Sequence, residues 1–270
     1  MSNYIHGSAP EEQARLARLN ELINSRCINL LNLQEGNTVL DVGSGLGQFT
    51  HAMASNVGTA GKCVGIERDK NQLKMALQNL EVSLVKNVEF RQGNAENLML
   101  NAGEWGSFDV AYARFVLEHV KQPENVVAGM AKAVKKGGRV VLADDDHELF
   151  KLYPEPAGFS IVWQAYIRSY DRLGNDPYIG RRLVSLLQQN GLQQIRNNAV
   201  FFGDTAGSPT FSAYARNVIG ILEGAKELMT KENLIGQASF EEAIRNIETW
   251  SSKPDAALWY TINWAEGVKA

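Results

Sequence analysis

The sequence has few cysteines and no long apolar run, and each shortage excludes a class of protein. Its 270 residues include two cysteines, Cys27 and Cys63, which are too few and too far apart for a disulfide framework or a CxxC metal or redox site. We expect two reduced thiols in the core. No segment approaches the roughly 18 consecutive apolar residues of a membrane span, and the first residues hold no apolar stretch for a signal peptide. The sequence therefore predicts a cytoplasmic protein with no membrane partner.

The chain also has no excess of positive charge. Its 27 Lys and Arg against 30 Asp and Glu give a net charge of −3, and neither sign forms a run that would follow a phosphate backbone. We therefore expect no nucleic-acid partner. A hydrophobic content of 44% excludes a disordered chain.

Short apolar segments alternate along the chain with longer segments of helical periodicity. This alternation is typical of a parallel sheet with helices on both faces. It predicts an α/β fold with a Rossmann-like, seven-stranded, mostly parallel sheet. The strands are expected at residues 38–42, 63–67, 88–91, 108–113, 139–143, 194–202 and 257–268.

Capping residues indicate where the helices begin and end. Asp69 is expected as an N-cap with Gln72 reaching back to it, and Pro123 as a first-turn proline. The helix that follows Pro123 is expected to stop at Gly137 and Gly138. A further helix is expected to begin at residues 176–177 and to end at Gly191.

Two helical parts stand outside the strand–helix alternation. They are a leading helix from Pro10 to about Leu33 and a helical stretch at 208–252. Because the ligand crevice of an α/β sheet lies at the carboxyl ends of its strands, we expect both parts to cover one site. The chain is predicted to be one domain, made of an N-terminal helical lid (1–35), a core (36–202), a helical insertion (203–255) and a last strand (256–270).

The first predicted strand runs into a glycine-rich loop, VLDVGSGLGQFT. A strand, a glycine turn and a helix N-terminus together bind a negatively charged group. Gly43 and Gly45 fit the dinucleotide pattern, but its third glycine position holds Gln48, and the third glycine is Gly47. This departure favours an adenosine-bearing ligand other than a dinucleotide. A nicotinamide-dependent oxidoreductase on a Rossmann sheet stays the alternative.

Three further stretches that follow the glycine loop hold residues able to bind an adenosine. Glu67 ends the second predicted strand, where a carboxylate accepts hydrogen bonds from both ribose hydroxyls of an adenosine. Asn94, in GNAENL, is expected at the edge of an adenine ring. The segment FDVAYARFVLEHV (108–120) leaves the sheet beside the same pocket.

These stretches, with VKKGGRVVLADD (134–145), resemble the successive motifs of class I S-adenosylmethionine-dependent methyltransferases. The resemblance covers the first half of the chain and is closest to small-molecule enzymes related to ubiquinone and menaquinone C-methyltransferases. It implies S-adenosylmethionine as the cofactor. The residues expected at the cofactor are Gly43, Ser44, Gly45 and Gly47 at the methionine end, Glu67 at the ribose, Arg68, Asn94, Ala95 and Glu96 toward the adenine, Arg114 and Phe115 along the pocket, and also Gln72. The family usually has Asp where this chain has Asn94.

The leading helix supplies further candidates. Methyl transfer is an in-line displacement that needs alignment and the exclusion of water. Tyr4, Gln13 and Arg15 are therefore expected to close over the cofactor. The alternative for these residues is an ordinary solvated helix face.

The acceptor side is expected at ADDDHELF (143–150), directly after the fifth predicted strand. A metal site would need further acidic or amide ligands from the neighbouring strand, and residues 112–114 offer none, so no metal is expected. His147 is the candidate catalytic base, whereas His119 is expected to be structural. The predicted reaction is methyl transfer to a small-molecule acceptor at oxygen or nitrogen. A non-catalytic partner protein of the same fold stays open, as does a homodimer.

Overall fold

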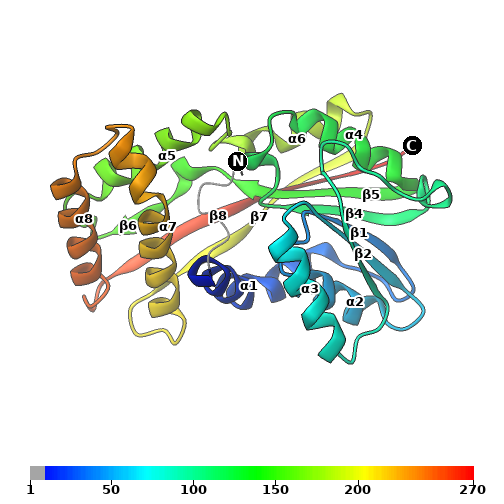
Figure 1. Ribbon diagram of the computed structural model, residues 1–270, viewed down its shortest axis with the longest axis horizontal. Coiled ribbons are helices and arrows are strands. Elements are labelled where there is room, and N and C mark those ends of the chain that lie inside the picture. The colour runs from blue at the N-terminus through cyan, green and yellow to red at the C-terminus, as the bar shows by residue number, and fades with distance from the viewer. Residues whose placement is uncertain (1–9) are drawn as a thin grey trace. The chain divides into compact units, whose positions relative to one another are not determined.

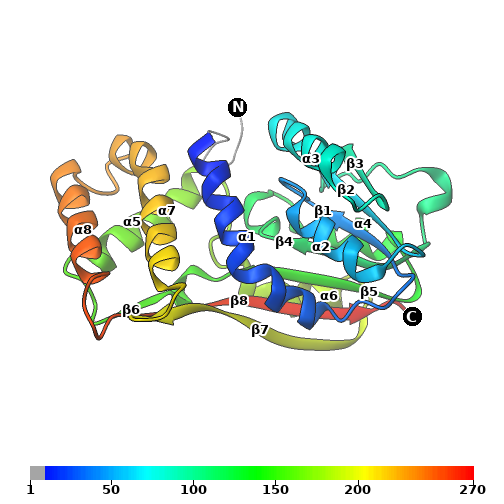
Figure 2. The same ribbon diagram turned by 90° about the horizontal axis from the view of Figure 1, so that it is seen from below.

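The computed structural model describes residues 10–270, with side chains from residue 13 on (Figures 1 and 2). The chain divides into two compact units. Unit 1 comprises the chain up to Leu22, Asp146–Pro177 and Phe201–Thr261. Unit 2 comprises Ile23–Asp145, Tyr178–Val200 and Ile262–Ala270. The division of the chain into one core with lid and insertion therefore stays a prediction.

The elements follow the predicted alternation. The helices are α1 (Pro10–Leu31), α2 (Gln48–Val57), α3 (Lys70–Val82), α4 (Pro123–Ala133), α5 (Phe159–Leu173), α6 (Leu183–Gln189), α7 (Phe211–Lys231) and α8 (Gln237–Trp250). The strands are β1 (Thr38–Val42), β2 (Lys62–Glu67), β3 (Val88–Gln92), β4 (Phe108–Arg114), β5 (Val134–Asp145), β6 (Lys151–Tyr153), β7 (Gln193–Thr205) and β8 (Ala257–Val268). Short 3₁₀ turns are η1 (Ala102–Glu104), η2 (Leu117–His119), η3 (His147–Leu149) and η4 (Ile179–Arg182).

The sheet has the order β3-β2-β1-β4-β5-β8-β6, and β7 also pairs with β8. Strands β1 to β5 are parallel, whereas β8 is antiparallel to both β5 and β6. The predicted fold class is confirmed, but the sheet has eight strands among the described residues rather than seven. The missed strand, β6, is three residues long with one buried side chain, Leu152, and so short a segment shows no alternation.

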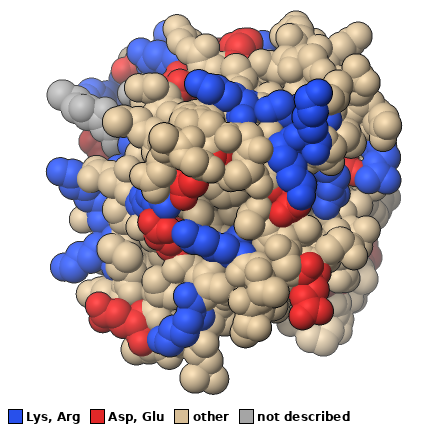
Figure 3. All heavy atoms as spheres, turned by 90° about the vertical axis from the view of Figure 1, so that its right-hand side faces the viewer, with Lys and Arg blue, Asp and Glu red and all other residues tan. Residues whose placement is uncertain are grey.

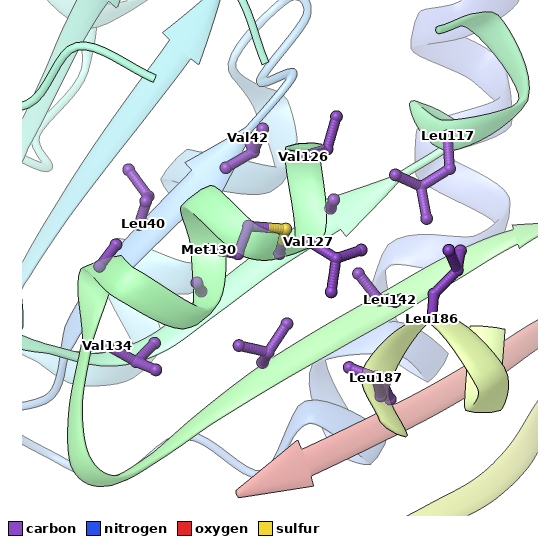
Figure 4. Close-up of a cluster of buried hydrophobic side chains, with 14 of the residues drawn as sticks. Leu40, Val42, Leu117, Val126, Val127, Met130, Val134, Leu142, Leu186 and Leu187 are labelled. Carbon is purple, nitrogen blue, oxygen red and sulfur yellow. The ribbon is translucent and has the colours of Figure 1, made fainter. Parts of the chain in front are cut away.

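Unit 2 has helices on both faces of its part of the sheet. In Figure 1, α2 and α3 lie below the strands and α4 and α6 above them. Figure 4 shows Val126, Val127 and Met130 of α4 pointing at the sheet, near Leu186 and Leu187 of α6. All five side chains are at most 1% exposed, so burial of apolar surface between these layers holds the unit together.

Two helix boundaries in unit 2 differ from the sequence-based expectation. Helix α4 ends at Ala133, because β5 already begins at Val134, which pairs with Phe108 ahead of an irregularity in the ladder. The helix expected from residue 176 begins instead as η4, and α6 follows only at Leu183. A Cβ on Gly180 would lie 2.8 Å from the backbone of Asp145, so a close backbone approach dictates this turn.

Unit 1 contains helices α5, α7 and α8, strand β6, and the parts of α1, β7 and β8 that fall within its residues. Helices α5, α7 and α8 pack against one another, as both views show (Figures 1 and 2). The predicted helical insertion is thus present as α7 and α8. The aromatic stretch after Phe159 is the amphipathic helix α5, and its rings Trp163, Tyr166 and Tyr170 are buried.

Other expectations from composition can be compared with the structure. Both cysteines are free and buried, as predicted. No helix among the described residues is long and apolar enough to cross a membrane. On the face shown in Figure 3, several Lys and Arg side chains adjoin one another at the upper right, and the other charged side chains are scattered among uncharged ones.

Candidate functional site

The glycine loop, defined as residues 43–47, connects β1 to α2 in unit 2. The N–H groups of Gly43 and Ser44 donate to the carbonyl of Ile66 on β2, at 2.8 and 3.0 Å. Gly43, Gly45 and Gly47 have φ values of 77°, 55° and 77°, in the left-handed region that favours glycine. Backbone geometry therefore explains all three glycines of the motif.

Close packing adds a second reason for Gly47. A Cβ there would lie 2.5 Å from the ring of Phe90 on β3 and 3.0 Å from the Cβ of Ala76 on α3. Gly47 is also the N-cap of α2. The loop therefore packs against Phe90 and ends at the N-terminus of α2. The partial positive charge of that N-terminus favours an anionic ligand group.

Glu67 joins the glycine loop to the start of α3. Its Oε2 accepts the N–H of Gly45 at 2.8 Å, and its Oε1 accepts the N–H of Asp69 at 2.7 Å. The side chain is buried, and burial raises the pKa of its carboxyl. Asp69 caps α3 by accepting from the N–H groups of Asn71 and Gln72, each at 2.9 Å, which confirms the predicted N-cap.

The loop surface carries polar groups that suit an adenosyl amino acid. The hydroxyl of Ser44 is buried and has no hydrogen-bond partner within the described part of the chain. The Oε1 of Gln72 lies 3.2 Å from the place of a Cβ on Gly45, so a side chain at position 45 would narrow this space. Buried polar atoms are nearly always paired. The residues present therefore fit a ligand with carboxylate, ammonium and ribose hydroxyl groups.

Asp41 lies in β1 directly before the glycine loop. Its Oδ2 accepts the hydroxyl proton of Thr50 from α2 at 2.6 Å. Burial raises the pKa of Asp41 to about 6, while the Thr50 bond and the positive charge of Arg114 lower it. The carboxyl group is therefore mostly ionised at neutral pH although it is buried.

Arg114 ends β4 and is held on several sides. Its Nη2 donates to Asn24 Oδ1 of α1 at 2.9 Å, and its guanidinium carbon lies 4.3 Å above the centre of the Phe49 ring and 5.7 Å from that of Phe115. Phe115 has a φ of 55°, a strained value for an aromatic residue, and strain of this kind is typical of functional sites. The predicted pair 114 and 115 thus sits where β4 leaves the sheet.

The β3 loop, defined as residues 93–101, follows β3 beside Glu67. The N–H of Gly93 donates to the carbonyl of Glu67 at 3.0 Å. Asn94 Oδ1 accepts the N–H of Glu96 at 3.1 Å, which turns the amide oxygen toward the loop backbone. Ala95 is partly buried, whereas Arg68 is exposed. The structure thus brings the glycine loop, Glu67 and the β3 loop together at the carboxyl ends of neighbouring parallel strands.

Comparison with known proteins agrees with this geometry. A family model described as a methyltransferase domain matches residues 33–170. The demethylmenaquinone methyltransferase of Bacillus cereus is 34% identical over 192 residues, which cover 66% of this chain and 79% of that relative. The chain belongs to the class I S-adenosylmethionine-dependent methyltransferases.

Two further matches show how much of the chain resembles known proteins. The demethylmenaquinone methyltransferase of Lactococcus lactis is 33% identical over 169 residues, and the match spans 63% of this chain but only 61% of that relative's length. The YcgJ protein of Bacillus subtilis shares the fold, with a TM-score of 0.58 and 17% identity over 92% of this chain and 98% of that chain. The YcgJ likeness shows the fold alone, whereas the family match and the Bacillus cereus relative confirm the predicted family and its cofactor.

Two of the three lid candidates of this methyltransferase, Gln13 and Arg15, lie in the first half of α1. Tyr4 lies outside the described residues. Arg15 donates from Nη1 to Asn217 Oδ1 of α7 at 2.7 Å, and its Cδ lies 3.0 Å from the place of a Cβ on Gly220. Arg15 therefore anchors α1 on α7 within unit 1. Gln13 is partly buried in the same unit, and a cofactor role for these residues stays a prediction.

His147, the candidate base, lies in η3 among the aromatic side chains of unit 1. Its Nε2 is 3.0 Å from the hydroxyl of Tyr170, and its Nδ1 is 3.1 Å from that of Tyr260. The Tyr170 hydroxyl in turn lies 2.9 Å from that of Tyr166. Any proton that His147 accepts or releases through these contacts therefore passes through a tyrosine hydroxyl.

Two acids expected near the acceptor serve as caps. Asp144 Oδ2 accepts the N–H groups of Val116 and Leu117, at 3.1 and 2.8 Å, and burial raises the pKa of this carboxyl. Asp146 caps η3 by accepting the N–H of Glu148 at 3.2 Å. Both side chains fix the turns that follow β4 and β5.

Sequence reasoning missed several residues around Arg114. Phe49 is not among the residues expected at the site, yet the Arg114 guanidinium lies over its ring. Asn24 lies in the second half of α1, inside the predicted lid (1–35) but beyond the three residues expected to close over the cofactor. The signal that could have indicated Asn24 is its polar side chain beside Ile23 and Cys27 on α1, both of which are 0% exposed.

Proposed function

We propose that this methyltransferase transfers the methyl group of S-adenosylmethionine to a small organic acceptor. The observation that carries the proposal is the Glu67 carboxylate bonded to the glycine loop at the N-terminus of α2. The cofactor supplies an electrophilic methyl group on a sulfonium. Gly43, Ser44, Gly45 and Gly47 would hold its methionine end, Glu67 its ribose, and Asn94, Ala95 and Glu96 its adenine.

The remaining site residues would orient the cofactor. Asp41, ionised at neutral pH, offers a negative charge before the loop, and Arg114 offers a fixed positive charge at the end of β4. Opposite fixed charges of this kind suit the ammonium and carboxylate of a methionyl group. Preorganised charges orient the ligand without rearrangement at the moment of reaction.

The acceptor atom has two candidates. The sequence led to an oxygen or nitrogen acceptor with His147 as the base. The two relatives are named for demethylmenaquinone, which favours an aromatic ring carbon of a hydroquinone. A phenol or hydroquinone offers both an oxygen and an electron-rich ring carbon, so we propose this class of acceptor.

Product analysis decides between the two atoms. The protein is incubated with S-adenosylmethionine labelled with carbon-13 in its methyl group and with a panel of phenols, hydroquinones and amines. The chemical shift of the labelled product identifies an O-, N- or C-methyl group. We expect methylated phenol or hydroquinone, and for an oxygen or nitrogen product a His147→Ala variant should lose about 100- to 10,000-fold in rate at saturating acceptor.

The control is the affinity for S-adenosylhomocysteine, which His147→Ala should leave unchanged because His147 lies outside the proposed cofactor residues. An O- or N-methyl product formed at the wild-type rate by the variant would contradict the base assignment. Failure to transfer label to any phenol, hydroquinone or amine would contradict the proposed acceptor class.

A further inference from the structure

The β3 loop begins beside the proposed ribose carboxylate. Glu67 pairs with Gln92 in the parallel register of β2 and β3, and the next residue, Gly93, donates its N–H to the Glu67 carbonyl. Loops at the carboxyl ends of parallel strands form the ligand crevice of such sheets. The position of the β3 loop therefore affects how the base of a bound adenosine is contacted.

One bidentate ion pair joins the two elements that flank this loop, β3 and η1. Arg91 of β3 donates from Nη1 and Nη2 to the two carboxylate oxygens of Glu104 in η1, at 2.6 and 2.7 Å. Each side chain is 19% exposed, so solvent screens the pair only in part. Bidentate pairs fix orientation as well as distance. We call this pair the clasp.

Glu104 also fixes the turn into which the loop runs. Its Oε2 accepts the N–H of Asn101 at 2.9 Å, and the Asn101 side chain accepts from the backbone of Glu104 in a capping box. Hydrogen bonds from Arg91 hold the pKa of Glu104 below its usual range, so the carboxylate is ionised at neutral pH. The Glu104 carboxylate thus both ties η1 to β3 and stabilises the start of η1.

The clasp is the inner part of a longer chain of charges. Arg91 Nε donates to Glu89 Oε1 at 2.6 Å, and Lys62 Nζ donates to Glu89 Oε2 at 2.8 Å. Lys62 and Glu89 are 49% and 42% exposed, and both stand on strands ahead of the loop. Exposed ion pairs contribute little to stability. Lys62 is therefore a matched control for a change in charge that leaves the clasp intact.

The middle of the loop is held by weaker contacts. Glu96 Oε1 accepts the N–H of Gln122 at 2.9 Å, and Leu98 packs 3.1 Å from the place of a Cβ on Gly129 of α4. Neither contact fixes the separation of the loop ends. The clasp alone among these contacts ties β3 directly to η1.

We propose that the Arg91–Glu104 clasp is a positioning pair that sets the β3 loop against the adenine of the cofactor, without touching the reacting atoms. The proposal rests on the proposed function, because it takes the cofactor to be bound with its adenine at residues 94–96. It predicts that the clasp controls cofactor affinity and base preference but not the methyl-transfer step.

The test compares three variants of the full chain. Arg91→Lys keeps the positive charge but cannot make two parallel hydrogen bonds to Glu104. Glu104→Gln keeps an acceptor for the Asn101 N–H but loses the negative charge. Lys62→Gln changes only the outer pair of Lys62 with Glu89. Calorimetry measures binding of S-adenosylhomocysteine and of S-inosylhomocysteine. Both clasp variants should bind S-adenosylhomocysteine about tenfold more weakly and distinguish the two bases less well. Lys62→Gln should match wild type.

Turnover and folding complete the test. At saturating S-adenosylmethionine, both clasp variants should keep the wild-type kcat within about twofold while the KM for the cofactor rises. Unchanged affinity and base preference in both variants would overturn the proposal. An equal loss in Lys62→Gln, or loss of the folded state in both clasp variants, would also overturn it, since the network would then serve stability. No binding to the wild-type protein would instead contradict the proposed function.

Discussion

Asp41 is the residue at which burial and charge conflict most directly. Its pKa rises from 3.8 to about 6, mainly through burial. The folded protein therefore holds the Asp41 proton more tightly than the unfolded chain does. Stability consequently falls as the pH rises from 3.8 to about 6. Thr50, with a hydroxyl 2.6 Å from the carboxylate, limits this loss by stabilising the ionised form.

Thr50→Val should therefore destabilise the protein in a pH-dependent way. A hydrogen bond to a charged group contributes about 1.5 to 3 kcal/mol. Thr50→Val loses this full contribution only at a pH at which Asp41 is ionised. Urea unfolding should show a loss in this range at about pH 8 and a smaller loss at about pH 5. Thr50→Ser keeps the hydroxyl and is the control. An equal loss at both pH values would contradict the ionised state of Asp41.

At the residue scale, sequence reasoning located Glu67 and the glycines better than it located their neighbours. Glu67 was predicted beside the glycine loop, and its bond to Gly45 places it there. The stacking of Phe49 on Arg114 could not be predicted, because it depends on which helix face turns toward β4. Local patterns specify periodicity, whereas such a contact depends on packing between distant segments.

Among the elements, the glycine loop is the most tightly constrained. Gly47 has a φ of 77° and is blocked by Phe90, whereas Gly36 has a φ of 82° with nothing within 4 Å of its Cβ position. At both positions a side chain would be strained by the left-handed backbone, and at position 47 it would also clash with Phe90. Comparing substitutions at the two positions therefore separates the cost of the backbone conformation from the cost of the clash.

Gly47→Ala should be more harmful than Gly36→Ala. The left-handed conformation costs a non-glycine residue roughly 1 to 2 kcal/mol, and overpacking adds about 1 to 3 kcal/mol. Thermal or urea unfolding should show the first loss in both variants and the second only in Gly47→Ala. S-adenosylhomocysteine affinity should fall only in Gly47→Ala. Equal effects of the two substitutions would show that Phe90 yields and that packing does not define the loop.

Helix and strand ends were predicted less well than the elements themselves. Asp69 and Pro123 mark the starts of α3 and α4 as expected, because caps act locally. The end of α4 at Ala133 and the late start of α6 were not expected. Both follow from sheet pairing by Val134 and close packing at Gly180, which involve residues distant in the sequence.

For the whole molecule, the alternating pattern was sufficient to predict the fold class. Strands β1, β2, β4 and β5 each carry an apolar run, and β3 (VEFRQ) alternates apolar and polar residues. These five strands form the parallel part of the sheet. The division into two compact units has no local signal in the sequence, because unit 1 gathers segments from three separate parts of the chain. No local pattern reports which distant segments pack together.

The central claim for the whole protein is that it binds an adenosyl amino acid cofactor through Glu67 and the glycine loop. Calorimetric titration with S-adenosylhomocysteine and with NAD(H) or NADP(H) tests this claim most directly, using wild type, Glu67→Ala and the exposed-site control Glu81→Ala. We expect saturable binding of S-adenosylhomocysteine alone. Affinity should fall about a hundredfold or more in Glu67→Ala and stay unchanged in Glu81→Ala. Saturable binding of a nicotinamide cofactor with none of S-adenosylhomocysteine, or an affinity of Glu67→Ala within about threefold of wild type, would contradict the account.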